Sequence, residues 1–294
     1  MQFKTSAIIA VMLSFLSGCY GKDCLTKQTT KPEHLKRLLE TNKCPGCNLG
    51  DADLQKTNLM GADLSQAELV KAVLDGANLQ KANLSKTQFS WYEIDTGWGS
   101  ITSCEVNLAA SLKKANLEEA NLKGANLRRV NIENANLSYA NLRNASLSQA
   151  NLERANLKQA NLKQANLFGL YSNLKEANLE GANLKGTNIQ LANLEGANLE
   201  GANLKKANFS HANFKNANLG DSDLYKANLE QADLSQSILS NADLRGANLL
   251  GAILPDYQKS PLPPPKLEGA IMPDGTIYKE KYSNSLDSTQ PNAK

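Results

Sequence analysis

Residues 150–168 read ANLERANLKQANLKQANLF, a sequence that repeats every five residues. With the central Leu as position i, Ala occupies i−2, Asn occupies i−1, and polar residues vary at i+1 and i+2. In an α-helix, five residues turn the chain by about 500°, so the leucines would fall on every face. In an extended segment, positions i−2 and i point to one face and i−1 points to the other. The pattern therefore predicts that Ala and Leu face inward and Asn faces outward.

The odd period determines how successive segments are joined. A continuous strand would reverse its buried face at each repeat, because side chains alternate with a period of two. The chain avoids this reversal if i+1 and i+2 stay outside and form a corner. Four corners close a square, so about 20 residues make one coil, and stacked coils pair at about 4.8 Å. The sequence therefore predicts an all-β fold, a right-handed quadrilateral β-helix with a short N-terminal helical cap.

The tandem A(N/D)LXX motif resembles that of the pentapeptide repeat family, whose fold is this square β-helix. Motif centres recur at 49–89, 112–167 and 174–254, which gives 38 units. The segments LKRLLETNKCPGCNL and LEGAIMPDGTIY, before and after the repeats, are similar to those of exported cyanobacterial members. Many members have no assigned biochemical activity, so the resemblance implies a fold and leaves the function open.

The repeats and their interruptions predict nine segments. They are a lipoprotein-type signal peptide at 1–18, an N-terminal segment with a helical cap at 19–43, a first repeat block at 44–89, an aromatic insertion at 90–111, a second block at 112–167, a corner bulge at 168–173, a third block at 174–254, a Pro-rich linker and C-terminal cap at 255–282, and a disordered tail at 283–294.

Residues 1–19, MQFKTSAIIAVMLSFLSGC, have the features of an export signal. Lys4 supplies the positive region, and the apolar segment that follows is too short to span a bilayer. The sequence Leu-Ser-Gly-Cys that ends at Cys19 resembles a bacterial lipobox, in which the chain is cleaved before the Cys and the Cys is acylated. Cys19 is therefore the predicted lipidation site of a membrane-anchored protein. Plain cleavage nearby is the alternative, and it would release a protein of the periplasm or thylakoid lumen.

An open end of such a helix is an exposed strand edge and needs a cap. Residues 30–41, TKPEHLKRLLET, predict a helix that covers the N-terminal edge. Thr30 and Glu33 have the spacing of a capping box. The apolar face of this helix is expected to consist of Leu35, Leu38 and Leu39. At the other end, residues 261–265 predict a stiff linker, and residues 270–272 resume the inward pattern as a C-terminal cap.

Two interruptions break the period. The insertion contains both tryptophans and is expected to be either an aromatic binding loop or an excursion that packs on the solenoid. The second break puts seven residues between the centres Leu167 and Leu174, and a corner bulge there would push apolar groups outward. The candidate partner contacts are Trp91, Trp98, Phe168, Leu170 and Tyr171.

Four cysteines remain besides the lipobox residue. In an exported chain an even number suggests disulfides, here with three connectivities among Cys24, Cys44, Cys47 and Cys104. Cys44 and Cys47 have CxxC spacing, but the sequence has no βαβ pattern for a redox role and no second ligand pair for zinc. We expect a buried small residue or a structural disulfide at this motif.

The charge of the repeat body is balanced. Residues 49–254 contain 20 Lys and Arg against 21 Asp and Glu, within a chain of net charge +3. Strong nucleic-acid binding needs many cations facing phosphates, so no nucleic-acid partner is expected.

One column of cations is nevertheless predicted on the surface. If the seven-residue break leaves the sides in phase, the i+1 residues of seven centres stack over about 30 Å. Six of these seven are cations, and the other is Tyr225. We name these six residues the basic column: Lys123, Arg143, Lys163, Lys185, Lys205 and Arg245. They are the candidate contacts to an anionic membrane surface or an acidic partner, although edge lysines also keep repetitive β surfaces soluble.

Three classes of function follow from these features. The chain has two histidines, His34 and His211, and no nucleophile–base pair or metal cluster at useful spacing, so no enzyme and no cofactor are expected. Family members that protect gyrase by mimicking DNA are strongly acidic and cytoplasmic, unlike this chain. The favoured function is an exported, non-enzymatic structural or protein-interaction rod with an unidentified protein partner. The alternative is a lipoprotein that binds a membrane surface through the basic column, and oligomers would form through the solenoid ends.

Overall fold

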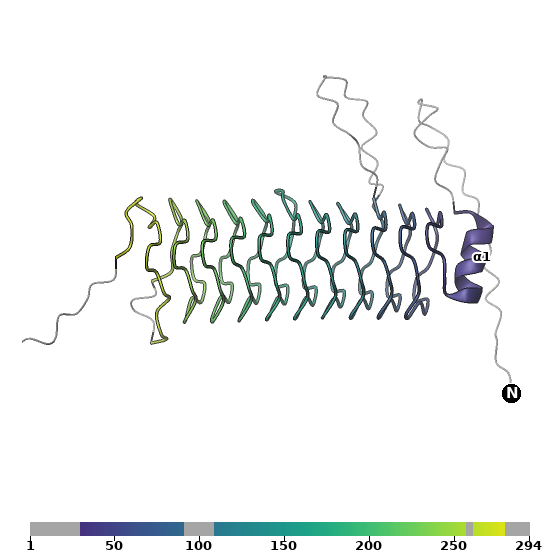
Figure 1. Ribbon diagram of the computed structural model, residues 1–294, viewed down its shortest axis with the longest axis horizontal. Coiled ribbons are helices and arrows are strands. Elements are labelled where there is room, and N and C mark those ends of the chain that lie inside the picture. Colours follow the sequence, from purple (N-terminus) through teal and green to yellow (C-terminus); the bar gives the residue numbers. More distant parts are fainter. Residues whose placement is uncertain (1–29, 91–108, 257–260, 280–294) are drawn as a thin grey trace, which may run out of the picture.

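The computed structural model describes residues 30–90, 109–256 and 261–279, and these wind into a single column of stacked coils (Figure 1). One helix, α1 (Pro32–Thr41), lies at the N-terminal end of this column. Each coil contributes isolated parallel bridges rather than long strands, as in the series Asn116, Asn136 and Asn156. The register between neighbouring coils is therefore 20 residues. Within the described ranges, no helix has the length and apolar character that crossing a membrane requires.

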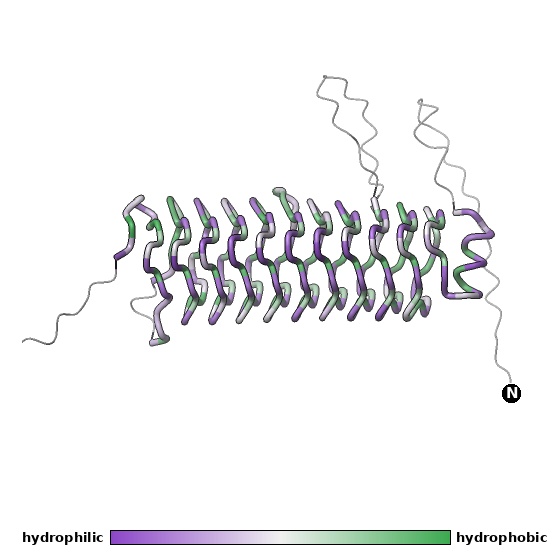
Figure 2. The backbone as a smooth tube through the Cα atoms, viewed as in Figure 1, coloured by the Kyte–Doolittle hydropathy of each residue, from purple (hydrophilic) through white to green (hydrophobic). Residues whose placement is uncertain are grey.

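The interior is a ladder of leucines and alanines. Ala155 and Leu157 are fully buried, and the same positions of almost every repeat behave alike. Phe209 and Phe214 take the leucine position of adjacent repeats, and their rings meet edge to face with centroids 5.1 Å apart. Hydrophobic and hydrophilic residues alternate in the same way along the coils (Figure 2). Alternation of the apolar residues thus places the core inside the square, as the sequence predicts.

Backbone hydrogen bonds join each coil to both neighbours. The N–H of Leu157 donates to the carbonyl of Asn178 in the next coil at 2.7 Å. The N–H of Asn156 donates to the carbonyl of Ala135 in the previous coil at 2.9 Å. Within the coil, the N–H of Ala160 donates to the carbonyl of Leu157 at 2.9 Å and closes the corner. These backbone N–H groups are therefore satisfied within a coil or by the neighbouring coils.

The outward asparagines form hydrogen-bonded ladders. On one side, eight of them run from Asn58 to Asn218, and the side-chain amide of each one after Asn58 donates to the amide oxygen one coil earlier at 3.0–3.5 Å. The same oxygens also accept from the backbone two residues on, as when Glu180 N–H donates to Asn178 at 3.1 Å. Asn at i−1 therefore stabilises both its own corner and the stack.

Both interruptions leave the sides in phase. Asn83 pairs with Asn121 across the insertion, and Asn161 pairs with Asn183 across the seven-residue break. At the bulge, the Ser172 hydroxyl accepts from the N–H of Gln149 at 2.8 Å and takes the role that a backbone carbonyl has elsewhere. The extra residues are absorbed at one corner without shifting the register.

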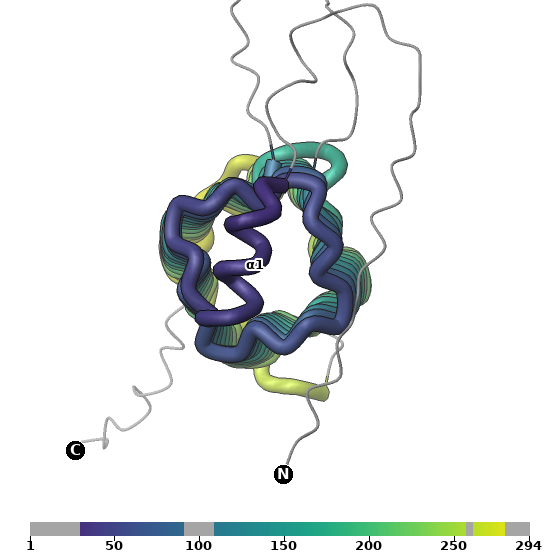
Figure 3. The backbone as a smooth tube through the Cα atoms, turned by 90° about the vertical axis from the view of Figure 1, so that its right-hand side faces the viewer, coloured from purple at the N-terminus to yellow at the C-terminus, as the bar shows by residue number. Residues whose placement is uncertain are grey.

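Helix α1 lies across the N-terminal end of the coils (Figure 3). Leu38 belongs to the core cluster with 1% of its surface exposed, and Leu35 packs against that cluster. The capping-box prediction is wrong. The N-cap is Lys31, no side chain caps the helix, and the Thr30 hydroxyl donates to the carbonyl of Gly50. Of the three predicted apolar residues of the helix, Leu38 is buried and Leu35 is partly buried, whereas Leu39 is 52% exposed.

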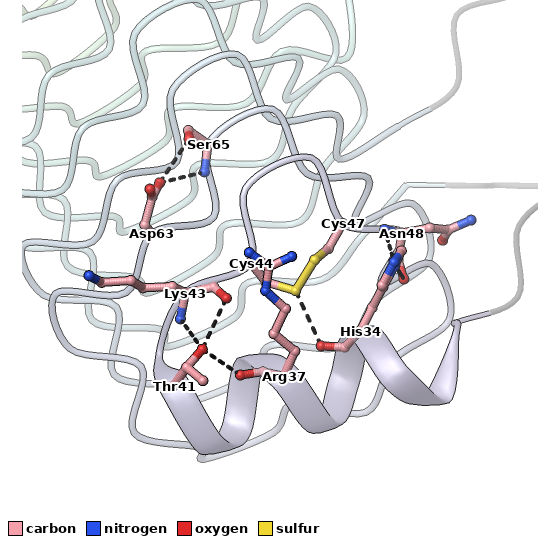
Figure 4. Close-up of a disulfide and its surroundings, with 9 residues drawn as sticks. All are labelled: His34, Arg37, Thr41, Lys43, Cys44, Cys47, Asn48, Asp63 and Ser65. Atoms are coloured by element: carbon pink, nitrogen blue, oxygen red, sulfur yellow. Dashed lines mark hydrogen bonds between the residues drawn. A yellow bond between two sulfur atoms is a disulfide. The ribbon is translucent and has the colours of Figure 1, made fainter.

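A disulfide between Cys44 and Cys47 lies next to α1, where the first coil begins (Figure 4). Both residues are buried, and Cys44 occupies a leucine position because the neighbouring Lys43 pairs with Asp63. His34 connects the helix to this coil, since its Nδ1 accepts from the N–H of Asn48 at 2.9 Å. The first coil therefore begins at Lys43.

The C-terminal end is closed differently. Lys266 pairs with Asp243 and Ile271 pairs with Asn248, so residues 266–272 continue two sides of the square. The chain then folds back, and Ile277 pairs antiparallel with Ile271. This reversal covers part of the last strand edge.

The corner residue at i+2 adopts the left-handed conformation in most repeats, including Gly201 with φ 63°. A Cβ added there would meet no atom within 4 Å, so a substitution tests the backbone alone. We expect Gly201→Val to lower the free energy of unfolding by about 1–2 kcal/mol, the cost of this conformation for an L-residue. Gly201→Asn should cost less, because Asn tolerates this region. Urea unfolding of both variants checks the prediction, and equal losses would contradict it.

Leu38 and Leu39 provide a matched pair for the role of α1. We expect Leu38→Ala to lower the free energy of unfolding by roughly 2–5 kcal/mol, as for other buried leucines. Leu39→Ala should change it little, because that side chain is half exposed. Hydrogen exchange of the Leu49 amide should speed up in the first variant only. If Leu38→Ala left this amide as protected as in the native protein, α1 would not stabilise the coil.

Candidate anionic-surface interface

The parallel bridges divide the surface into four sides that follow one another around the square. We number them by the residues at the leucine position: Leu122, Leu142 and Leu162 on side 1, Leu127, Leu147 and Leu167 on side 2, Ile132, Leu152 and Leu174 on side 3, and Leu137, Leu157 and Leu179 on side 4. The i+1 and i+2 residues of each side form its corner with the next.

The basic column lies at the corner between sides 1 and 2. The preceding outward residues form one series of bridges from Asn121 to Asp243, so the six cations stand above one another. Across the bulge, the N–H of Gln164 donates to the carbonyl of Lys185 at 3.1 Å, which stacks Lys163 directly beside Lys185. The structure therefore brings all six column residues to one edge.

The cations at the two ends of the column differ in whether a carboxylate neutralises them. Lys205 pairs with Asp223 at 2.8 Å, and Arg245 pairs with Asp243 at 2.7 Å. The hydrogen bond from Arg245 lowers the pKa of Asp243, and the hydrogen bond to Asp223 raises the pKa of Lys205. The other four cations, Lys123, Arg143, Lys163 and Lys185, form no ion pair within the described residues. The unpaired positive charge is thus concentrated on the middle coils.

This positive region extends across side 2. Over the five coils between Lys123 and His211, side 2 and its two corners carry no Asp or Glu. Asn and Ser occupy the outward positions between the corners. The eight cations of this region are Lys123, Arg128, Arg129, Arg143, Lys163, Lys185, Lys205 and Lys206. We name the region the acid-free side.

Sides 3 and 4 of the same coils have mixed charge. Their cations pair with carboxylates one coil away, as Lys158 does with Glu180 at 3.0 Å and Lys175 with Glu195 at 3.3 Å. Arg154 contacts Glu176 in the same manner at 2.8 Å. The near-zero net charge of the body therefore combines two kinds of surface: two sides on which cations lie beside carboxylates, and a third side that carries cations and no acids over these coils.

The bulge lies at the other edge of the acid-free side. It projects beyond the square at the corner between sides 2 and 3 (Figure 3). Its apolar side chains point outward, with exposed fractions of 43% for Phe168, 70% for Leu170 and 74% for Tyr171. The insertion leaves from the same corner, since the N–H of Ala110 donates to the carbonyl of Phe89 at 2.8 Å.

Several predicted site residues lie outside the described residues, namely Cys19, Cys24, Trp91, Trp98 and Cys104. Within the described ranges, no three His, Cys, Asp or Glu residues meet in an arrangement that suits a metal ion. A hollow of about 90 Å³ lies at the C-terminal end between Leu239 and Pro263. It is well below the size of ordinary ligand sites.

Sequence reasoning found the basic column but missed the acid-free side. A single column can be predicted from the 20-residue period alone. The acid-free side includes residues of two corners and a bulge, so predicting it also requires knowing which corners are adjacent. The missing acids were the available signal, because every Asp and Glu between Lys123 and His211 falls on sides 3 and 4.

The pentapeptide repeat profile matches eight copies in this chain, over residues 57–91, 110–169 and 171–256. The chain therefore belongs to the pentapeptide repeat family, whose members form right-handed quadrilateral β-helices and are generally non-enzymatic structural or interaction proteins. None of the curated proteins compared matches it.

Three solved structures are similar to it. HetL, a pentapeptide repeat protein involved in heterocyst differentiation regulation from Nostoc sp. strain PCC 7120, is 32% identical, with 85% of this chain and 100% of HetL covered and a TM-score of 0.41. Rfr23 from Cyanothece 51142 is 27% identical, with 70% and 97% covered and a TM-score of 0.30. A protein of the Arabidopsis thaliana thylakoid lumen is 22% identical, with 55% and 68% covered and a TM-score of 0.13.

The Asp243–Arg245 pair predicts a pH dependence. The pKa of Asp243 is lowered in the folded protein, chiefly by the hydrogen bond from Arg245. The pair therefore stabilises the fold above the ordinary carboxyl pKa, and this contribution is lost as the pH falls through the lowered pKa. We expect Asp243→Asn to be less stable than the native protein at neutral pH and equally stable in strong acid. Asp233→Asn is the control, because Asp233 has no ion pair in the described structure. A pH-independent difference would contradict the prediction.

Proposed function

We propose that this protein is an exported, non-enzymatic interaction rod that binds an anionic surface through its basic column. The proposal rests on a stack of four cations, Lys123 to Lys185, which form no ion pair with the described residues and lie on one edge of the middle coils. A column of like charges without carboxylate partners raises the positive potential along this edge, and this potential attracts an external anion.

Solubility alone is a weaker explanation of these cations. Lysines that keep a β surface soluble need only be exposed, and on sides 3 and 4 they lie beside carboxylates of the next coil. The repeat body contains as many acids as cations, so carboxylates could also stand one coil away from the cations of the basic column. The absence of acids beside Lys123, Arg143, Lys163 and Lys185 supports binding as the role of this part of the edge.

The N-terminal sequence supports placement at a membrane. Diacylation of Cys19 would anchor the rod stably, because two lipid signals hold a protein where one does not. The basic column would then lie within reach of anionic headgroups. A protein released by plain signal cleavage is the second candidate, and it would use the column against an acidic soluble partner.

Binding to carboxylate-coated beads tests the charge of the column without any apolar phase. We expect Lys123→Gln, Lys163→Gln and Lys185→Gln combined in the mature protein to weaken binding by about 3 kcal/mol, on the basis of about 1 kcal/mol per cation. The control combines Lys56→Gln, Lys114→Gln and Lys215→Gln, which remove the same charge from side 3. Equal losses in the two variants would reject a specific role of the column.

The mass of the mature N-terminal peptide tests export. A diacylated peptide that begins at Cys19 in the membrane fraction is the expected result. An unmodified N-terminus in the soluble fraction would reject the lipoprotein form and leave the soluble-partner form.

A further inference from the structure

We infer that the acid-free side is the surface on which the rod lies against an anionic lipid bilayer, with the bulge at Phe168–Tyr171 entering the headgroup region. This inference rests on the proposed function and assigns the column a bilayer as its partner. It adds a second element, the apolar bulge, which an electrostatic contact alone does not require.

The charge distribution on the acid-free side suits a planar anionic surface better than a linear anionic partner. Cations stand at both of its edges: Lys123 and Arg143 belong to the column at one corner, and Arg129 lies at the other corner, where the cations are confined to one coil. The strip between them holds uncharged Asn and Ser. A linear polyanion would follow one column and leave the other edge unused. A planar array of anionic headgroups meets both edges at once.

The acid-free side has defined limits. Glu68 and Glu230 occupy side 2 in the coils toward either end, so the region without acids covers the middle of the rod. Along the rod axis, the bulge lies between these two limits, at the edge of the acid-free side that faces side 3. The apolar side chains of the bulge therefore border the same acid-free side as the cations of the basic column.

The bulge is held in a projecting shape. Its Ser172 hydroxyl accepts from the N–H of Gln149, and the N–H of Gly169 donates to the carbonyl of Gln190 at 3.1 Å. Gly169 has φ 131°, and a Cβ there would meet the Gln149 side chain at 3.2 Å. These contacts fix both ends of the loop, so Leu170 and Tyr171 remain exposed instead of folding onto the coils.

The chemistry of the bulge matches the membrane interface. Tyrosine is enriched at headgroup level, where its ring meets apolar and polar groups together. Leu170 provides an apolar side chain beside it, and Leu191 lies partly exposed on the next coil. Basic residues with exposed Leu and aromatic residues are the combination found on interfacial elements that bind anionic lipids.

Depth-dependent fluorescence quenching tests the inference in the full mature protein. The reporter is Leu170→Trp in a background with Trp91→Phe and Trp98→Phe, and its control is Tyr139→Trp in the same background. Tyr139 is 56% exposed and lies on side 4. The probes are vesicles of phosphatidylcholine with and without phosphatidylglycerol, made with acyl chains brominated near the headgroup.

The expected result is quenching and a blue shift of the reporter at position 170 on vesicles with phosphatidylglycerol, and neither change at position 139. Lys123→Gln, Lys163→Gln and Lys185→Gln should weaken this response roughly 100-fold, at about fivefold per cation. The side-3 control, Lys56→Gln, Lys114→Gln and Lys215→Gln, should retain it. An acyl anchor alone would bring both reporters equally close to the vesicle. A difference between their responses therefore shows which side of the rod faces the bilayer.

Equal responses at positions 170 and 139 would overturn the inference. If the column variant still lost binding to carboxylate-coated beads, the proposed function would stand and only the bilayer assignment would fail. Preference for polyglutamate or duplex DNA, with position 170 unquenched on vesicles, would likewise overturn the inference. If the column variant bound beads and vesicles as the native protein does, the proposed function would fail as well.

Discussion

The backbone hydrogen bonds between neighbouring coils are the interaction on which the rest of the structure depends. They set the register at 20 residues, so that a residue type repeated in the sequence becomes a column in space. The buried leucines, the asparagine ladders and the basic column all follow from this one register. Because each coil contacts only its neighbours, the stack is stabilised locally along its length.

The same register separates two kinds of surface. On sides 3 and 4, opposite charges meet one coil apart and form ion pairs such as Lys158–Glu180. On the acid-free side, cations stack on cations, and Asn and Ser separate its edges. Exposed ion pairs contribute little to stability, so this difference has little effect on the fold. It strongly affects the electrostatic potential on each side, which determines what the rod attracts.

The sequence predicts the interior closely because the five-residue period leaves few alternatives. It also predicts the basic column, since the seven-residue break can be absorbed at one corner. The capping box could not be judged from sequence, because Thr30 instead donates to Gly50 in the neighbouring coil. The exposure of Leu39 depends on the angle at which α1 crosses the first coil. The acid-free side depends on which corners are adjacent, and a linear pattern does not show this.

The basic column depends on the register across the bulge, because this register places Lys163 beside Lys185. A direct test is oxidation of the protein carrying Lys163→Cys and Lys185→Cys, with the cross-linked peptide identified by mass. Neighbouring coils are about 4.8 Å apart, within the span of a disulfide. The register predicts rapid cross-linking of this pair and none between Lys163→Cys and Gln190→Cys, one corner away. Cross-linking of the second pair instead of the first would show that the bulge shifts the sides, and the basic column would not exist.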